Sequence, residues 1–401
     1  MRRLRSLLAW LLPLLVLVGV GWWLASKPVV RFSLGPADEL LAEPGVETFL
    51  LHVPETGWCV HTLASRAATD GRPLGADVIG RPALLSSGSV VALTPRGLEW
   101  RRVGNVIVPG GEQALLCTRD MLPDDVALEG TIGGKDALLS SPYQDGRRLF
   151  LVPGSPLTKP ALYPVADRDG QALVPAGAPL ILARAARALA FLGQDGWEAW
   201  TLSDTGLAER AVAAGYTKPG AIFTPDGRSL IFPGKVDGIF RLTLDDGLVN
   251  LMCGGNIGVS RRTPQSWAFR TDPLRLVTPQ WDLDGWLQIA HIHVQGPSRY
   301  FTMGGNHHYG VAMSQDGRTL AYVQANFDEK TDEPFVEDVY LFDFERVETG
   351  AEQIDSRDGG RPLQGPCFIG EHSALAYLAG GEAIRIDIQA TAPVPADPSE
   401  N

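Results

Sequence analysis

The chain has 401 residues, of which 45% are hydrophobic and 20% are charged, and this composition excludes an intrinsically disordered chain. Its 45 glycines and 30 prolines follow no collagen-like period, so they indicate many turns and exclude a protein built mainly of long helices. The formal net charge of -11 gives no attraction to phosphate, so nucleic acid is excluded as a favourable partner.

The N-terminal residues 1–27 carry a signal for the membrane. Arg2, Arg3 and Arg5 precede an uncharged, largely apolar run over residues 6–26. Such a run is long enough to cross a bilayer as a helix, and the arginines favour a cytoplasmic N-terminus. We therefore expect an uncleaved, single-pass anchor in the inner (cytoplasmic) membrane, with the remaining chain in the periplasm or outside. The alternative is a cleaved signal peptide, although residues 24–26 fit a cleavage site poorly.

Two similar stretches, residues 223–232 and 313–322, reveal an internal repeat. In each, an Asp-Gly pair predicts a turn with positive φ, and the alternating residues after it predict a strand with one buried face. Weaker copies recur along the chain at intervals of about 40 to 56 residues. The aliphatic residues that mark the predicted strand of each copy are Leu50, Leu93, Leu149, Leu189, Leu230, Leu276, Leu320 and Leu375.

This spacing is typical of a β-propeller, in which each blade is a four-stranded sheet. Residues 221–252 illustrate one blade, with predicted strands at 221–223, 228–232, 239–244 and 248–252. We therefore predict an all-β fold in which residues 28–390 form a propeller of seven or eight blades, with eight favoured. Residues 391–401 are rich in proline and acidic residues, and they are predicted to form a disordered tail.

The last repeat contains only three predicted strands, at residues 367–369, 375–378 and 383–388. Residues 29–34 resemble a strand that belongs to no repeat. Because a propeller must join its first and last blades, we expect this N-terminal segment to supply the missing fourth strand.

The pattern Pro/Gln-Asp-Gly-Arg-x-Leu-x-Phe/Tyr at residues 225–232 and 315–322 resembles the PD40, or WD40-like, repeat of TolB-type β-propellers. The chain differs from TolB because no α/β domain precedes the repeats. The family includes partner-binding platforms, sensors, peptidase-associated propellers and metal-dependent lyases. The resemblance therefore implies the architecture more firmly than it implies an activity.

Four cysteines, Cys59, Cys117, Cys253 and Cys367, would lie in an oxidising compartment under the expected topology. Their even number allows two disulfides in three connectivities, and buried free thiols are the alternative.

One face of the predicted ring carries the loops between blades and the loops that join second to third strands, and propellers commonly bind ligands there. The similarity of residues 252–257 and 302–307 places both segments in inter-blade loops on this face. An acidic loop at residues 324–337 lies on the same face. The candidate binding residues of this face are Arg261, Arg262, Asn306, His307, His308, Asp328, Glu329, Asp332, Glu333 and Glu337.

His307 and His308 are also candidates for metal binding or acid–base chemistry, because imidazoles beside carboxylates can hold a transition metal. Adjacent residues of a strand point to opposite faces, which favours a structural role, so no cofactor is predicted. His291 and His293 alternate along a strand and are expected on an exposed outer face. Trp58, Trp281 and Trp286 are expected to pack between sheets, with sugar stacking as the alternative.

The sequence thus favours a membrane-tethered, extracytoplasmic propeller that serves as a protein-interaction or scaffold module of the cell envelope. Its expected partner is a protein or an envelope component. The alternative is a metal-assisted hydrolase or lyase that acts on envelope polysaccharide or peptide, and a sensor of a small ligand is a third interpretation. The sequence shows no nucleophile elbow, phosphate loop or His-Glu-x-x-His motif, so a non-enzymatic role is favoured.

Overall fold

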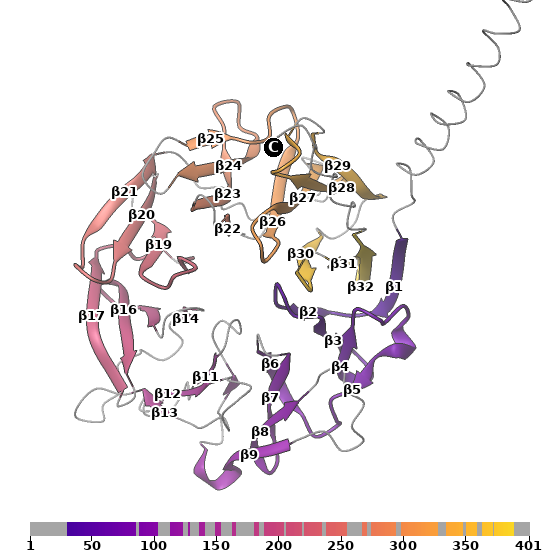
Figure 1. The fold of residues 1–401 in the computed structure, drawn as a ribbon, viewed down its shortest axis with the longest axis vertical. Coiled ribbons are helices and arrows are strands. Elements are labelled where there is room, and N and C mark those ends of the chain that lie inside the picture. Colours follow the sequence, from indigo (N-terminus) through magenta and orange to yellow (C-terminus); the bar gives the residue numbers. More distant parts are fainter. Residues whose placement is uncertain are drawn as a thin grey trace, which may run out of the picture.

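The computed structural model describes residues 30–388 except for 86–87, 103–112, 123–126, 129–135, 141–148, 154–162, 166–179, 184–187, 204–205, 219, 235–237, 255–266, 271–273, 294–297, 328–333, 348–349, 359–362 and 372. Within these described residues, 32 strands form eight four-stranded antiparallel sheets. Figure 1 shows the sheets arranged as a ring around a common centre, which is the architecture of a β-propeller. The sequence allows seven or eight blades, and the eight sheets correspond to a ring of eight blades.

The blades are numbered in chain order, and the strands of each are given from the centre of the ring outward. Blade 1 comprises β2 (Glu39–Ala42), β3 (Thr48–Val53), β4 (Gly57–Thr62) and β5 (Arg72–Pro73), and blade 2 comprises β6 (Ile79–Leu84), β7 (Ser89–Thr94), β8 (Gly97–Arg102) and β9 (Gln113–Thr118). Blade 3 comprises β10 (Ala127–Leu128), β11 (Asp136–Ser140), β12 (Leu149–Pro153) and β13 (Tyr163–Val165), and blade 4 comprises β14 (Leu180–Leu182), β15 (Ala188–Leu192), β16 (Gly196–Ser203) and β17 (Gly206–Ala214).

Blade 5 comprises β18 (Ile222–Phe223), β19 (Ser229–Pro233), β20 (Gly238–Thr243) and β21 (Val249–Gly254), and blade 6 comprises β22 (Ala268–Arg270), β23 (Arg275–Trp281), β24 (Leu287–His293) and β25 (Ser298–Tyr300). Blade 7 comprises β26 (His307–Met313), β27 (Thr319–Phe327), β28 (Pro334–Asp343) and β29 (Glu352–Asp358), and blade 8 comprises β30 (Gln364–Ile369), β31 (Ala374–Ala379), β32 (Glu382–Asp387) and β1 (Val30–Pro36). Two short 3₁₀ helices, η1 (Ala68–Asp70) and η2 (Arg119–Met121), lie outside the sheets.

The two ends of the ring share blade 8. β1 pairs antiparallel with β32, so that Val30 lies opposite Asp387 and Ser33 lies opposite Ile384. This pairing confirms the prediction that an N-terminal strand completes the last repeat. Because the outermost strand of blade 8 comes from the start of the chain, opening the ring requires the loss of a full strand pairing.

The repeated Asp-Gly turn has the same hydrogen bonds in blades 5 and 7. Gly227 and Gly317 have φ values of 70° and 72°, as the sequence predicts. The Thr224 hydroxyl donates to Asp226 Oδ1 at 2.6 Å, and the Ser314 hydroxyl donates to Asp316 Oδ1 at the same distance. A hydroxyl residue two positions before the aspartate therefore belongs to the repeat as well.

The leucines that mark the predicted strand of each repeat lie on the second strand of the sheet in seven blades, and in the remaining blade the leucine lies on a different strand. Those of the seven blades lie on β3, β7, β15, β19, β23, β27 and β31 and are almost completely buried. Leu149 instead begins β12, the third strand of blade 3, which corrects its predicted place. An Asp-Gly turn followed by an alternating strand describes any hairpin of a blade, so the pattern alone cannot say which two strands it joins.

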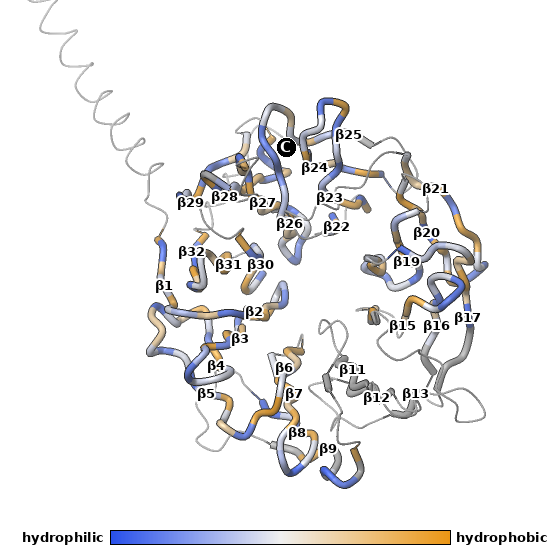
Figure 2. The backbone as a smooth tube through the Cα atoms, turned by 180° about the vertical axis from the view of Figure 1, so that it is seen from behind, coloured by the Kyte–Doolittle hydropathy of each residue, from blue (hydrophilic) through white to orange (hydrophobic). Residues whose placement is uncertain are grey.

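Most of the core lies between neighbouring sheets. One cluster combines Trp197 of blade 4 with Phe232 of blade 5, and another combines Tyr309 of blade 7 with Tyr377 of blade 8. Figure 2 shows hydrophobic stretches along strands such as β6 to β8 and hydrophilic stretches in the turns. This distribution is expected of sheets that bury both faces against their neighbours.

The ring has two distinct faces. We call the face with the loops between blades and between second and third strands the loop face, and the opposite one the terminus face. β1 runs to the loop face, where residues 37–38 lead into β2, so its first residue, Val30, lies at the terminus face. Asp387 lies opposite Val30, so the chain enters and leaves the ring at the terminus face.

In the described part of the chain, no helix has the length and apolar character that crossing a membrane requires. The expected anchor and the expected C-terminal tail both fall outside the described residues. The domain boundaries at residues 27 and 390 therefore stay predictions.

Candidate functional site

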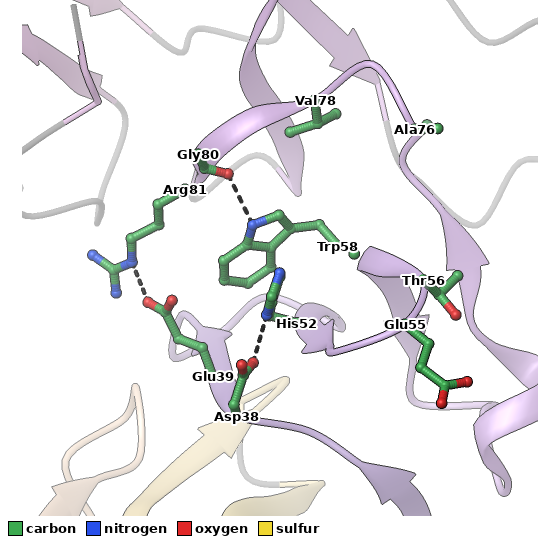
Figure 3. Close-up of a pocket in the computed structure, with 12 residues that line it drawn as sticks. Asp38, Glu39, His52, Glu55, Thr56, Trp58, Ala76, Val78, Gly80 and Arg81 are labelled. Carbon is green, nitrogen blue, oxygen red and sulfur yellow. Dashed lines mark hydrogen bonds and ion pairs between the residues drawn. The ribbon is translucent and has the colours of Figure 1, made fainter. Parts of the chain in front are cut away.

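A pocket of about 620 Å³ opens between blades 1 and 2 at the loop face. Its walls come from three places, which are the start of β2, the turn between β3 and β4, and the segment that leads from blade 1 into β6. Figure 3 shows the side chains gathered around the indole of Trp58. The lining residues are Asp38, Glu39, His52, Glu55, Thr56, Gly57, Trp58, Gly75, Ala76, Val78, Gly80 and Arg81.

Trp58 is the largest lining residue, and it is held in place by the backbone of blade 2. Its Nε1–H donates to the carbonyl oxygen of Gly80 at 3.0 Å. β6 has an irregular register between Ile79 and Ala83, and Gly80 has a φ of 67°, which other residues rarely adopt. The irregular start of β6 thus provides the carbonyl that orients the indole.

His52 and Asp38 form a second contact in the pocket. Their Nδ1 and Oδ1 atoms are 2.5 Å apart, and the imidazole lies 5.1 Å from the Trp58 ring, centroid to centroid. Both side chains remain partly exposed. The carboxylate and the imidazole are therefore accessible to a ligand that enters from solvent.

Two arginines shape the blade 2 side of the pocket. Arg81 pairs with Glu39, so a half-exposed ion pair links the two blades across the opening. Arg101 is buried and donates to the carbonyl oxygen of Leu74 and, at 3.2 Å, to Asp77. These bonds fasten the inter-blade segment that forms one wall.

The pocket has a negative balance of charge. Asp38, Glu39 and Glu55 line it, whereas Arg81 is the one lining residue among those described that carries a permanent positive charge. No described residue forms an ion pair with Glu55, which lies exposed in the turn between β3 and β4. An arrangement of this kind attracts a cation.

The structure places Asn306, His307 and His308 at the loop-face end of β26, but it buries both histidines. Their exposed fractions are 9% and 4%. His307 Nδ1 accepts the backbone N–H of Leu287 at 3.2 Å, and its ring packs 5.1 Å from that of Trp286. His308 Nε2 lies 3.2 Å from Gln324 Oε1, and burial lowers the pKa of this imidazole. These contacts are those of packed core residues.

Glu337 has a structural position at the boundary of blades 7 and 8. It accepts hydrogen bonds from the Tyr309 hydroxyl, from Arg357 and from the backbone N–H of Leu363. Burial raises the pKa of this carboxyl, and the bonds from Leu363 and Arg357 oppose that rise. The residue is part of the core of β28 and not of an exposed acidic loop.

The other candidates of the sequence fall outside the described residues. They are Arg261, Arg262, Asp328, Glu329, Asp332 and Glu333. Within the described residues, no three His, Cys, Asp or Glu side chains come together in a way that could hold a metal ion. His307 and His308 are therefore part of no such group within the described residues.

Three of the four cysteines are free thiols. Cys59 and Cys253 are buried, Cys367 is partly exposed, and the side chain of Cys117 is not described. Burial raises the pKa of all three thiols, to about 12 for Cys367. These cysteines are thus part of the packing and poor nucleophiles.

His291 differs from its expected place on an exposed face. Its Nδ1 lies 3.2 Å from Arg275, and its ring lies 5.6 Å from Phe344 of blade 7. Burial, together with the charge of Arg275, lowers the pKa of His291 to about 4. The third strands of adjacent blades are close enough to cover part of a side chain that a single blade would expose.

Sequence reasoning identified the face of the ring that carries the pocket but not the pocket itself. Its carboxylates come from segments that are separated along the chain, and no motif connects them. No repeat or predicted element of the sequence singles out Asp38 or Glu55.

Known proteins resemble this chain at the level of the fold. A protein described as TolB from Agrobacterium tumefaciens has 15% identity over 63% of this chain and 87% of its own, with a TM-score of 0.37. The WD40 domain of SCAP from fission yeast has 10% identity over 90% of this chain and 94% of its own, with a TM-score of 0.49. A chain of the Mitotic Checkpoint Complex has 10% identity over 88% and 94%, with a TM-score of 0.44.

No family model matches the sequence, and no curated protein matches it. The likeness to TolB and WD40 propellers is thus a likeness of architecture and assigns no activity.

Proposed function

We propose that this chain is a membrane-tethered, extracytoplasmic β-propeller that binds a protein partner on its loop face as an interaction module of the cell envelope. The tether is supported by the uncharged run over residues 6–26 and the arginines before it. The binding role rests mainly on one observation, the acidic pocket between blades 1 and 2.

The chemistry of the pocket selects a basic side chain. A lysine or arginine of the partner would meet the carboxylates of Asp38 and Glu55, and Arg81 would repel an acidic residue. Since Asp38 and Glu55 are solvent-accessible, this attraction is screened by salt. The wall of Trp58 and His52 adds an aromatic surface for the methylene groups of the entering side chain.

A titration with peptides tests this proposal. The full chain in lipid nanodiscs would be titrated with the peptide Ac-Gly-Leu-Arg-Leu-Gly-NH₂ and with its Glu counterpart. We expect binding of the Arg peptide, weaker binding at high salt, and a loss of about tenfold in affinity, or about 1.4 kcal/mol, in the double variant Asp38→Asn, Glu55→Gln.

The matched control is Glu345→Gln, which removes an exposed carboxylate between β28 and β29 at the terminus face. Equal binding of the two peptides, or an equal loss in the control, would contradict the proposed role of the pocket. The tether has its own test, because membranes washed with carbonate should retain a chain that still contains residues 1–27, which peptide mass spectrometry would detect.

A further inference from the structure

We propose that Leu283 and Met303 form a second contact for a protein partner, on the face of the ring that is turned away from the bilayer. This inference rests on the tether of the proposed function. It adds a surface in blade 6, remote along the chain from the pocket of blades 1 and 2.

The two side chains are the most exposed of the large hydrophobic residues in the described part of the chain. Leu283 is fully exposed, and Met303 is 84% exposed. Leu283 lies in the turn between β23 and β24, and Met303 lies in the loop between β25 and β26. Both segments belong to the loop face.

Ordered backbone supports both residues. Asp282 Oδ1 accepts the N–H groups of Asp284 at 3.0 Å and Trp286 at 2.8 Å, which fixes the turn around Leu283. Gln288 Nε2 donates to the carbonyl oxygen of Gly304 at 2.9 Å, which fastens the loop next to Met303. Side chains held by ordered segments lose less conformational entropy on binding.

Exposed apolar residues near a membrane can meet either lipid or protein, and the topology favours protein. Val30 pairs with Asp387 at the terminus face, so a segment that precedes Val30 leaves the ring there. An anchor within residues 1–27 is followed by only a few residues before β1, which draws the terminus face toward the bilayer. Leu283 and Met303 lie on the opposite face and point into the extracytoplasmic space.

The surrounding charge defines the partner further. Asp282 and Asp284 flank Leu283, and no described residue forms an ion pair with Asp284. The surface fits an apolar side chain that stands next to a lysine or arginine. The pocket between blades 1 and 2 selects the same kind of charge, so a single partner with a basic surface could engage both.

The first experiment separates lipid from protein. In a Cys117→Ser background, Leu283→Cys and Leu248→Cys would each carry a fluorescent label in nanodiscs with spin-labelled lipid headgroups. Leu248 is the control, because it is 57% exposed in the turn between β20 and β21 at the terminus face. We expect less quenching at position 283 than at position 248. Equal or stronger quenching at 283 would overturn the inference, whereas a chain that fails to associate with nanodiscs would overturn the tether.

The second experiment identifies the contact. A photo-reactive p-benzoylphenylalanine at position 283 or 248 of the full chain would be activated in intact envelopes, and cross-linked peptides would be identified by mass spectrometry. We expect a defined protein at position 283, cross-linked at a segment with apolar and basic residues, with at least tenfold less product in Met303→Ser. Lipid adducts, an acidic segment, the same products at position 248, or no effect of Met303→Ser would overturn the inference.

Discussion

Arg385 of the last blade donates a hydrogen bond to the backbone carbonyl oxygen of Ser65 in the first blade. The same guanidinium contacts Asp387 at 2.6 Å and lies 4.7 Å above the ring of Phe32, which belongs to β1. One buried side chain therefore connects the first blade with both strands that join the ends of the ring.

This contact predicts a large effect of Arg385→Met on ring stability. The variant leaves the Ser65 carbonyl without its donor and removes a buried, charge-assisted hydrogen bond, so we expect a loss of about 2–3 kcal/mol in the free energy of unfolding. Urea denaturation followed by tryptophan fluorescence measures it. Arg318→Met, which breaks an exposed pair with Glu345, should cost less than about 1 kcal/mol. Equal costs in the two variants would contradict this role of Arg385.

Tyr309→Phe tests the buried carboxylate at the boundary of blades 7 and 8. The hydroxyl of Tyr309 donates to Glu337, and its removal leaves a carboxylate oxygen less well satisfied in the core. We expect a loss of about 1–2 kcal/mol in denaturant unfolding at pH 7. Tyr300→Phe is the control, because the Tyr300 hydroxyl bonds to the Trp281 carbonyl at the surface. A loss in Tyr309→Phe no greater than in Tyr300→Phe would show that Glu337 does not need this donor.

Gly80→Ala tests the irregular start of β6. Nothing lies within 4 Å of a Cβ at this position, so the strain of a positive φ is the whole expected cost, about 1 kcal/mol. At Gly254, where φ is ordinary and space is also open, the same change should be neutral or slightly stabilising. Thermal unfolding of both variants checks the prediction. A neutral Gly80→Ala would mean that the β6 backbone does not need this conformation.

His61 predicts a loss of stability in acid. Burial lowers its pKa to about 4 in the fold, well below its value in the unfolded chain, and its ring stacks on Phe49. The unfolded state therefore takes up the proton first, so stability is full above about pH 6.5 and falls as the pH drops toward 4. His61→Gln should remove up to about 3 kcal/mol of this pH dependence, measured by urea unfolding at pH 7 and pH 4.5.

The control for this pH effect is His52→Gln, which changes a partly exposed histidine of the pocket. An undiminished acid sensitivity in His61→Gln would contradict the assignment to His61.

The cysteines predict slow thiol chemistry in the folded state. In Cys117→Ser, the thiols of Cys59, Cys253 and Cys367 are the ones left, and burial raises the pKa of each. We expect little reaction with Ellman's reagent in native buffer and reaction of three thiols in denaturant. Rapid native reaction, or fewer than three thiols after unfolding without reductant, would contradict the assignment of these cysteines as free thiols of low reactivity.

The sequence predicted the architecture well because propeller blades repeat local signals. The Asp-Gly turn, the alternating strand and the spacing of the leucines each describe contacts within one hairpin. The same locality caused the error at Leu149, where a hairpin signal was assigned to the wrong pair of strands. Closure by residues 29–34 was predictable because a ring permits no unpaired last strand.

The candidate site was less predictable because it depends on contacts between blades. His307 and His308 are hydrophilic in sequence, yet Trp286 packs against His307 once blades 6 and 7 come together, and Gln324 of the neighbouring strand β27 contacts His308. The Asp38 and His52 pair and the Arg81 and Glu39 pair join segments without any shared motif. Register and packing between repeats decide such contacts, and the repeat pattern itself contains neither.

The strand order of blade 8 also determines when, during synthesis of the chain, its last strand pair can form. Among the described strands β1 is synthesised first and its partner β32 last, so the edge of β1 that pairs with β32 has no native partner during almost all of synthesis. A chain that stops before β32 cannot close its ring. Only a finished copy pairs this edge of β1 with β32. A truncated copy leaves the edge exposed to aggregation and proteolysis, so the two kinds of copy differ in a property on which these processes act.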